Sequence, residues 1–437
     1  MKKQATSKPK SGGLMAFMED KFLPVATRIG GQRHLLALRD GIVMSMPLLI
    51  LGAFSMIIAE FPLEAFTNFM ASILGENWNA FEGVIMNGTY GIAAIVACFG
   101  VASSLVNSYE LDGTPAGIIS MSALFIIVVP SVFQDGEEAV EAWVAGSFDP
   151  ALLFTALLTA LIVGEIYRLL VQKNFIIKLP ASVPKAVSRQ FTALLPGAVI
   201  IIVFTALRLI FAITPWASFP EFVNVIISTP LRHLGTSYVG TLLVCFFEHL
   251  LWSFGLHGSA IIVFPIFEPL WLMNMAENIS AVAHNIVTFT FYENGVWMGG
   301  SGATLPVVIY MLLFAKSKLL KDVGKIGIAP GLFNINEPVT FGLPIVLNPV
   351  LMIPYILAPM AAMTVQYLGT AIGLFPLCNN MVPWTTPVLI SGFLTTGSIM
   401  GVVAQLCGLA VSFLIWLPFI TAYDRKNYQM ELEAAGK

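Results

Sequence analysis

A single carboxylate, Glu337, stands in the sequence Phe-Asn-Ile-Asn-Glu-Pro at positions 333–338. It matters because only 11% of the chain is charged and 57% is apolar. Pro338 follows at once, with Gly331 and Gly342 nearby, so a straight helix cannot run through this segment. In a chain this apolar, broken backbone is tolerated where it is buried in protein or lines a wet cavity. An ionisable group in such a place indicates a functional site.

Two amides accompany this carboxylate. Asn334 and Asn336 lie on the same short segment, and together with Glu337 they suit recognition of sugar hydroxyls. A carboxylate accepts from hydroxyls, whereas amides both donate and accept. Glu337 could also act as a general base on a hydroxyl. The alternative is a structural carboxylate that caps the ends of broken helices.

A second polar cluster covers 248–258 and contains His249 and His257. Eight residues of continuous helix would bring the two rings within about 80° of each other, two turns apart. Gly255 and Gly258 bracket His257 and should open the backbone around it. We therefore count His257, His249 and Gly258 as candidate site residues, the alternative being hydrogen-bonded histidines inside a bundle. No third ligand at a matching spacing supports a zinc site.

An aromatic candidate lies at 379–387, where Trp384 stands between two prolines. A tryptophan fixed in this way could stack on the apolar face of a sugar ring, with Asn380 as a further polar ligand. The alternative is a tryptophan that anchors the chain at the membrane interface.

Composition predicts an all-α protein that crosses the membrane many times, because a soluble chain would carry about a quarter charged residues. Five apolar runs in the first half are long enough to span a bilayer: 36–59, 84–105, 115–134, 149–170 and 191–214. The second half gives five more: 235–256, 259–273, 297–315, 349–375 and 398–422. Pieces cut by Pro and Gly, at 279–292, 326–347 and 381–395, predict re-entrant hairpins. Amphipathic surface helices are expected at 14–29 and 219–233.

Charge placement agrees with about ten spans. The basic N-terminus and the basic loop 316–325 fall on the cytoplasmic side, as does the C-terminus, whereas the acidic loop 135–138 falls outside. The change of texture near 217 divides the chain into a scaffold half, 1–217, and a half with the polar sites, 218–437. The four cysteines lie in apolar surroundings, which indicates buried thiols rather than a redox or metal role.

Four segments together resemble one family. They are 180–189 (PASVPKAVSR), 252–258 (WSFGLHG), 298–305 (MGGSGATL) and 333–344 (FNINEPVTFGLP). The chain resembles the membrane-embedded IIC component of the bacterial phosphotransferase system (PTS), in its lactose, cellobiose and diacetylchitobiose branch. The resemblance runs from 35 to the last span.

The resemblance implies a homodimer in the bacterial cell membrane, with the first half at the dimer contact and the second half binding sugar. It implies import of a β-linked disaccharide coupled to phosphorylation of its 6-hydroxyl, with a phosphocysteine on the IIB component as donor and IIA behind it. Glu337 and His257 would contact the reacting end of the sugar, and Trp384 would stack on it. No cofactor, metal or nucleic acid is implied.

Two matters stay open at this level. A proton-coupled sugar transporter using Glu337 and His257 would satisfy the same physics, because buried carboxylates and histidines make proton relays. The chain carries no segment with a nucleophilic cysteine after its last span, so phosphoryl transfer is expected to need a separate IIB protein. Which disaccharide is carried, and which residues dock IIB, do not follow from these motifs.

Overall fold

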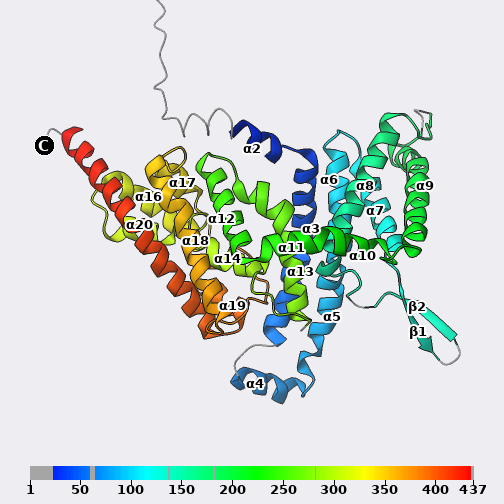
Figure 1. Ribbon diagram of the computed structural model, residues 1–437, viewed down its shortest axis with the longest axis horizontal. Helices are drawn as coiled ribbons and strands as arrows, with labels where there is room; N and C mark the ends of the chain where they lie inside the picture. The colour runs from blue at the N-terminus through cyan, green and yellow to red at the C-terminus, as the bar shows by residue number, and fades with distance from the viewer. Residues whose placement is uncertain are drawn as a thin grey trace, which may run out of the picture.

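The computed structural model describes residues 23–59, 64–135, 138–144, 146–180, 183–280 and 282–434. The described chain is almost entirely helical, and its sheet is one small hairpin (Figure 1). The first part of the expected surface helix at 14–29 lies outside the described residues, and its end is present as the short helix α2 (Leu23–Gly30).

The first half forms a group of helices around α6 and α8. Its main elements are α3 (Arg33–Ala59), α4 (Glu64–Leu74), α5 (Phe81–Gly88), α6 (Ala93–Asn107), α7 (Gly113–Ile127), α8 (Leu153–Gln172) and α9 (Lys185–Ala212). The strands β1 (Ser131–Asp135) and β2 (Glu138–Ala142) pair antiparallel between α7 and α8. The hairpin and α4 project on the side opposite to α2 (Figure 1).

The second half opens with short connecting helices, α10 (Phe219–Val223) and α11 (Thr229–Thr236), which match the expected surface connector at 219–233. It continues with the elements α12 (Tyr238–Ser253), η6 (Ser259–Phe267), α13 (Glu268–Ile279), α14 (Phe289–Val296), α15 (Leu305–Leu313), α16 (Lys318–Leu332), α17 (Glu337–Gly342), α18 (Pro349–Ala371), α19 (Ile390–Thr396) and α20 (Ile399–Ala434). The end of α20 and α2 lie on the same side of the molecule (Figure 1).

Seven described helices are long and apolar enough to cross a membrane, and an eighth is present if the bent pair 219–236 and 238–253 counts as one span. Shorter apolar helices occur at Ala65–Leu74 and Gly113–Ile127. The polytopic all-α prediction is therefore confirmed, whereas the count of about ten spans stays a prediction, since the helix at the expected span 115–134 has only 15 residues. The expected crossing at 259–273 is part of a candidate span, Ser259–Ile279.

The prediction of an ordinary span at 297–315 was wrong. Only Leu305–Leu313 is helical there, nine residues long, which is about 14 Å and well short of a bilayer core. Gly299, Gly300 and Gly302 all have positive φ, so the chain turns through a loop before α15 begins. The apolar composition was read correctly, but the glycines break the helix.

The second half contains short helices separated by irregular backbone, as expected for interrupted segments; re-entrant hairpins at these places stay a prediction. The chain between α13 and α14 is irregular, α16 and α17 are separated by the loop 333–336, and α19 follows an irregular stretch that starts near 376. Pro265 lies inside η6, which is wound as a π-helix. Proline removes a backbone donor, and π-helical turns often occur at functional sites.

Close helix contact in the scaffold half depends on glycine. A Cβ at Gly41 would lie 2.5 Å from the backbone nitrogen of Val101, and one at Gly100 would lie 2.9 Å from the Cα of Gly41. Small residues let membrane helices approach backbone to backbone, and α3 and α6 use them in this way.

The buried apolar residues form a large cluster that includes both halves, from Ala37 to Met381, and a second cluster within the second half around Tyr355 and Trp416. The halves are thus packed against each other through a shared core. A functional boundary near 217 remains a prediction.

The glycine loop before α15 should be sensitive to added bulk. Gly302 has φ +84°, and a Cβ there would lie 2.3 Å from the Tyr355 ring. We expect Gly302→Ala to lower the free energy of unfolding by about 1–3 kcal/mol or more, from backbone strain and the collision. Gly83→Ala, in open space on α5, is the control and should leave the melting temperature in detergent unchanged or raise it slightly, because alanine favours a helix over glycine. Equal melting temperatures for the two variants would contradict this interpretation of the loop.

Candidate functional site

A cavity of about 300 Å³ lies between α3 and the broken segments of the second half. The residues that line it come mainly from loops and helix ends: Trp252, His257, Ser259, Phe264, Glu268, Phe289, Glu293, Trp297, Gly300, Ser301, Asn334, Ile335, Asn336, Glu337 and Trp384. Its apolar wall on the other side is Val43, Met46 and Ile50 of α3. The cavity is therefore bounded by both halves of the chain.

Glu337 and His257, the first two candidates, both lie at this cavity. Glu337 begins α17, directly after the loop and directly before Pro338. The His257 Nδ1 accepts a hydrogen bond from the backbone N–H of Ala260 at 3.1 Å. Since a backbone N–H can only donate, neutral His257 carries its proton on Nε2 and has that N–H free to donate. The cavity thus offers a carboxylate acceptor and an imidazole donor.

Asn334 ties three loops together. Its Oδ1 accepts from the Gly299 N–H at 3.0 Å, and its Nδ2 donates to the carbonyl oxygens of Trp384 at 2.7 Å and Thr386 at 3.0 Å. Asn334 has φ +62°, in the left-handed region that asparagine tolerates better than most residues. The residue lines the cavity as predicted, but its amide holds the loops that carry other cavity residues.

Asn336 acts in the same way on the glycine loop. Its Nδ2 donates to the Ser301 carbonyl and, at 2.9 Å, to Thr304 Oγ1, and its side chain is buried. Both amide protons are therefore used within the protein. These hydrogen bonds position the loops next to Glu337. Binding of the sugar by Asn334 and Asn336 stays a prediction, and both residues line the cavity.

Trp384 lies at the cavity with 45% of its surface exposed. Its backbone carbonyl accepts a hydrogen bond from Asn334, which restricts the movement of the Trp384 backbone. An exposed indole on a tethered loop suits stacking against a sugar face, which stays a prediction for this residue.

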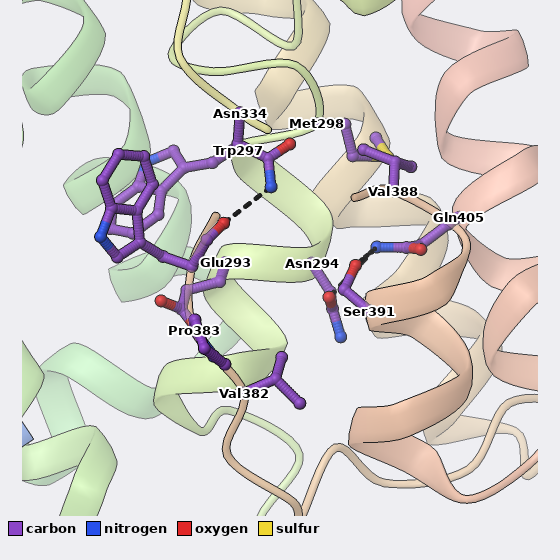
Figure 2. A pocket seen from close by; sticks show the side chains of 11 residues that line it. Glu293, Asn294, Trp297, Met298, Asn334, Val382, Pro383, Val388, Ser391 and Gln405 are labelled. Atoms are coloured by element: carbon purple, nitrogen blue, oxygen red, sulfur yellow. Dashed lines mark hydrogen bonds between the residues drawn. The ribbon is translucent and has the colours of Figure 1, made fainter. Parts of the chain in front are cut away.

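A small chamber of about 10 Å³ continues behind the same region, with Glu293 and Asn294 of α14 at its wall (Figure 2). Here Gln405 Nε2 donates to Ser391 Oγ at 2.9 Å and to Asn294 Oδ1 at 3.1 Å. Asn294 Nδ2 also donates to Thr395 Oγ1. These hydrogen bonds join α14, α19 and α20 next to the cavity.

The buried carboxylate Glu248 holds two residues of the cavity wall in place. It accepts hydrogen bonds from Ser259 Oγ, from Trp297 Nε1 at 2.9 Å and from the Tyr292 hydroxyl at 2.5 Å. Ser259 and Trp297 both line the cavity. Glu248 fixes these groups without lining the cavity itself. Sequence reasoning did not single it out, although an unpaired glutamate inside an apolar span was the available signal.

Aromatic rings continue along this wall from His257. The His257 ring lies 4.3 Å from that of Trp252 and 6.5 Å from that of Phe264. Phe264 in turn lies 6.0 Å from Trp297, which lies 6.2 Å from Phe289. Aromatic side chains therefore line this part of the cavity, as is common in small-molecule sites.

Three predicted site residues are not among those that line the cavity. His249 is 0% exposed, and its Nδ1–H donates to the Cys245 carbonyl at 2.7 Å. Gly258 packs against backbone, where a Cβ would lie 2.0 Å from the Glu248 carbonyl oxygen. Asn380 Nδ2 donates to the Leu394 carbonyl at 3.0 Å. The helix ends after Ser253, so the spacing argument that placed His249 beside His257 on one helix does not hold.

Several cavity residues were missed. Val43, Met46 and Ile50 recur at helical spacing on α3, but nothing distinguishes them in the sequence from other apolar span residues. Neither Glu268 nor Glu293 was among the predicted site residues. Both are acids inside apolar segments, which was the signal that could have found them.

The role of the hydrogen bonds to Glu248 can be tested without a ligand. Glu248→Leu leaves Ser259, Tyr292 and Trp297 without their acceptor, so we expect it to lower the free energy of unfolding by about 3 kcal/mol or more. Glu248→Gln keeps one acceptor oxygen, and its NH₂ can donate to the Tyr292 hydroxyl, so its loss should be clearly smaller. Thermal melting and tryptophan fluorescence of the purified protein measure both variants. Equal effects would show that hydrogen bonding at Glu248 is unimportant.

Several known proteins are similar to this chain. The family model described as "Phosphotransferase system, EIIC" matches residues 39–359. A cellobiose-specific EIIC component from Geobacillus stearothermophilus is 41% identical over 425 residues, covering 94% of each chain. A lactose-specific EIICB component from Streptococcus mutans is 28% identical over 432 residues, covering 95% of this chain and 73% of that protein.

Among solved structures, the chain matches the transporter ChbC, the IIC component of an N,N'-diacetylchitobiose-specific phosphotransferase system. The TM-score is 0.91 at 40% identity, over 96% of this chain and 100% of that one. The resemblance seen in the motifs is confirmed: the chain belongs to the EIIC family of the phosphotransferase system.

Proposed function

We propose that this protein is the sugar-translocating IIC subunit that imports a β-linked disaccharide of the cellobiose, diacetylchitobiose or lactose type and presents its 6-hydroxyl for phosphorylation by phospho-IIB. One observation carries the proposal: Glu337, His257 and Trp384, chosen from motifs far apart in sequence, line one cavity of about 300 Å³. The names of its relatives support the choice of sugar class.

The reacting hydroxyl is held from two sides. The Nε2–H of His257 donates to the hydroxyl oxygen, and the Glu337 carboxylate accepts the hydroxyl proton. When that oxygen attacks phosphorus, the bond from phosphorus to the cysteine sulfur of IIB breaks, and the proton passes to Glu337. Positioning and electrostatics supply most of the rate enhancement, as in phosphoryl transfer generally. Glu337 and His257 are the catalytic residues in this scheme.

Directional transport follows from the shape of the site and the charge of the product. The cavity has an α3 wall and a wall of broken segments, so motion of one half against the other would move the sugar between the two faces. The phosphorylated sugar carries added negative charge, which disfavours its return into a low-dielectric site. Chemistry, rather than an ion gradient, makes transport one-way. The proton-coupled transporter considered above has no support from the family assignment.

A PTS IIC subunit works with IIB and, through it, with IIA. A relative whose name joins IIC and IIB agrees with that dependence. We further propose a homodimer embedded in lipid in the bacterial cell membrane, with both termini in the cytoplasm. The position of α2 and the end of α20 on one side of the molecule supports the shared side of the termini (Figure 1).

Vesicle uptake tests the function as a whole. Vesicles containing the protein, IIB and IIA should accumulate phosphorylated cellobiose or diacetylchitobiose only when phosphoenolpyruvate and the general PTS proteins are supplied. Omission of IIB is the control and should stop product formation. Accumulation of unmodified sugar driven by a proton gradient alone would overturn the proposal.

The Glu337→Gln variant distinguishes binding of the disaccharide from its phosphorylation. Glutamine keeps the size and one acceptor oxygen but cannot take the proton, so we expect phosphorylation to fall by about 10²-fold or more. The dissociation constant of the disaccharide should rise much less. The matched control is Glu76→Gln, an exposed carboxylate outside the cavity. Phosphorylation of the disaccharide at wild-type rates by the Glu337→Gln protein would remove Glu337 from the mechanism.

A further inference from the structure

The exposed face of α16 carries a stripe of lysines. Lys318, Lys321 and Lys325 are all exposed and follow one another at intervals of three and four residues, a spacing that puts their side chains on one helix face. The same face ends in exposed Leu332, the last residue of α16. From Lys318 to Leu332 the helix rises by about 21 Å. The lysine stripe therefore runs along the surface towards the segment that contains Glu337.

Most of the charge on this stripe is not neutralised by the protein. Lys325 pairs with Asp322 at 3.1 Å, on the exposed surface of the same helix. Lys318 and Lys321 form no ion pair with any residue that the structure describes. Exposed ion pairs such as that of Lys325 are weak and exchange readily for other partners. All three ammonium groups can therefore interact with an anion from outside the chain.

Two carboxylates of α20 lie beside the start of α16, but they bond its first turn. Asp424 accepts a hydrogen bond from the Ser317 N–H at 2.9 Å. Glu431 accepts from the Ser317 hydroxyl at 2.7 Å and from the backbone N–H of Lys318 at 2.9 Å. These hydrogen bonds satisfy donors that the first turn of a helix leaves free. They hold α16 against α20 and leave the lysine side chains pointing outwards without a carboxylate partner.

Two arginines of the scaffold half differ in this respect. Arg39 pairs with Asp40 at 2.6 Å, and Arg168 pairs with Glu165 at 2.5 Å. Their charges are balanced by acids of the same helices, α3 and α8. On α16, by contrast, two of three lysines along one face are unpaired among the described residues.

The chemistry of phosphoryl transfer restricts where the donor protein can bind. The donor phosphorus must come into contact with the attacking hydroxyl oxygen, which in the proposed scheme is held at Glu337. Glu337 is exposed and lines the cavity, at the start of α17. The helix that leads to this position is α16. A phosphoryl group carries a charge of about −1.5 to −2 near neutral pH, which a positive surface attracts.

We propose that the lysine stripe of α16, formed by Lys318, Lys321 and Lys325, is the docking surface for phospho-IIB. The stripe attracts the phosphorylated protein and directs its phosphocysteine towards Glu337. This inference rests on the proposed function for the identity of the partner. After transfer IIB has lost the phosphoryl charge, so the attraction weakens and the dephosphorylated protein leaves more readily. The lysines act on association with IIB and not on the sugar.

The test uses Lys321→Glu and the double variant Lys321→Glu/Lys325→Glu in detergent-solubilised full-length protein. The dissociation constant of phospho-IIB is measured by direct binding, and its KM by phosphorylation of cellobiose and diacetylchitobiose. At about 50 mM salt we expect both constants to rise about fivefold or more in the single variant and further in the double variant. At about 500 mM salt the difference from wild type should shrink to less than about twofold, because salt screens surface charges.

The matched control is Lys173→Glu, the same charge change at the exposed residue that ends α8 in the scaffold half. Its constants for phospho-IIB should stay within about twofold of wild type at both salt concentrations. Because the α16 variants alter exposed side chains only, their melting temperatures and their dissociation constants for the disaccharide should equal those of wild type.

Unchanged constants for phospho-IIB in both α16 variants would overturn the docking surface, and so would an equal rise in Lys173→Glu. An effect that appears only in vesicles containing phosphatidylglycerol, and not in detergent, would overturn it as well, because the lysines would then bind lipid headgroups. Failure of the proposed function has a different signature. In that case the wild-type protein forms no phosphorylated sugar at any concentration of phospho-IIB, whereas direct binding still reports whether the stripe is needed.

Discussion

The structure depends on satisfying the backbone of broken segments in an apolar chain. Irregular backbone at membrane depth exposes donors and acceptors that lipid cannot satisfy, so the protein must do so itself. Asn334 and Asn336 meet this requirement, because their amides bond the glycine loop 299–304 and the loop around Trp384 to the segment that ends at Glu337. The amides that hold the loops therefore also fix the position of the carboxylate and the indole.

A second layer of buried polar groups fixes the walls around those loops. Glu248 holds Ser259 and Trp297 in place, and Gln405 joins α14 to α19 and α20. Networks of this kind are valuable when every member is bonded and costly when one is not. Glu268 and Glu293 are the exceptions at the cavity, since each has one buried oxygen without a hydrogen-bond partner.

Sequence reasoning was strongest where one residue type was out of place. Glu337 and His257 stood out against an apolar background, and both line the cavity. It was weakest where one composition was compatible with more than one structure. The run 297–315 has the hydropathy of a span, but its positive-φ glycines leave a helix of nine residues. His249 matched a helical spacing that ends at Ser253, and it is buried against the Cys245 carbonyl.

The sequence by itself determined that the chain is a polytopic helical membrane protein, that its second half is interrupted, and which family it resembles. These follow from composition and local motifs, because helix length, hydropathy and proline or glycine breaks act over short stretches. Only the tertiary structure decided that α3 of the first half forms one wall of the cavity. It also decided that Asn334 and Asn336 hold neighbouring loops in position through hydrogen bonds. It also placed Glu268 and Glu293 at the wall of the same cavity. These depend on contacts between segments far apart in the chain, whose partners no local pattern encodes.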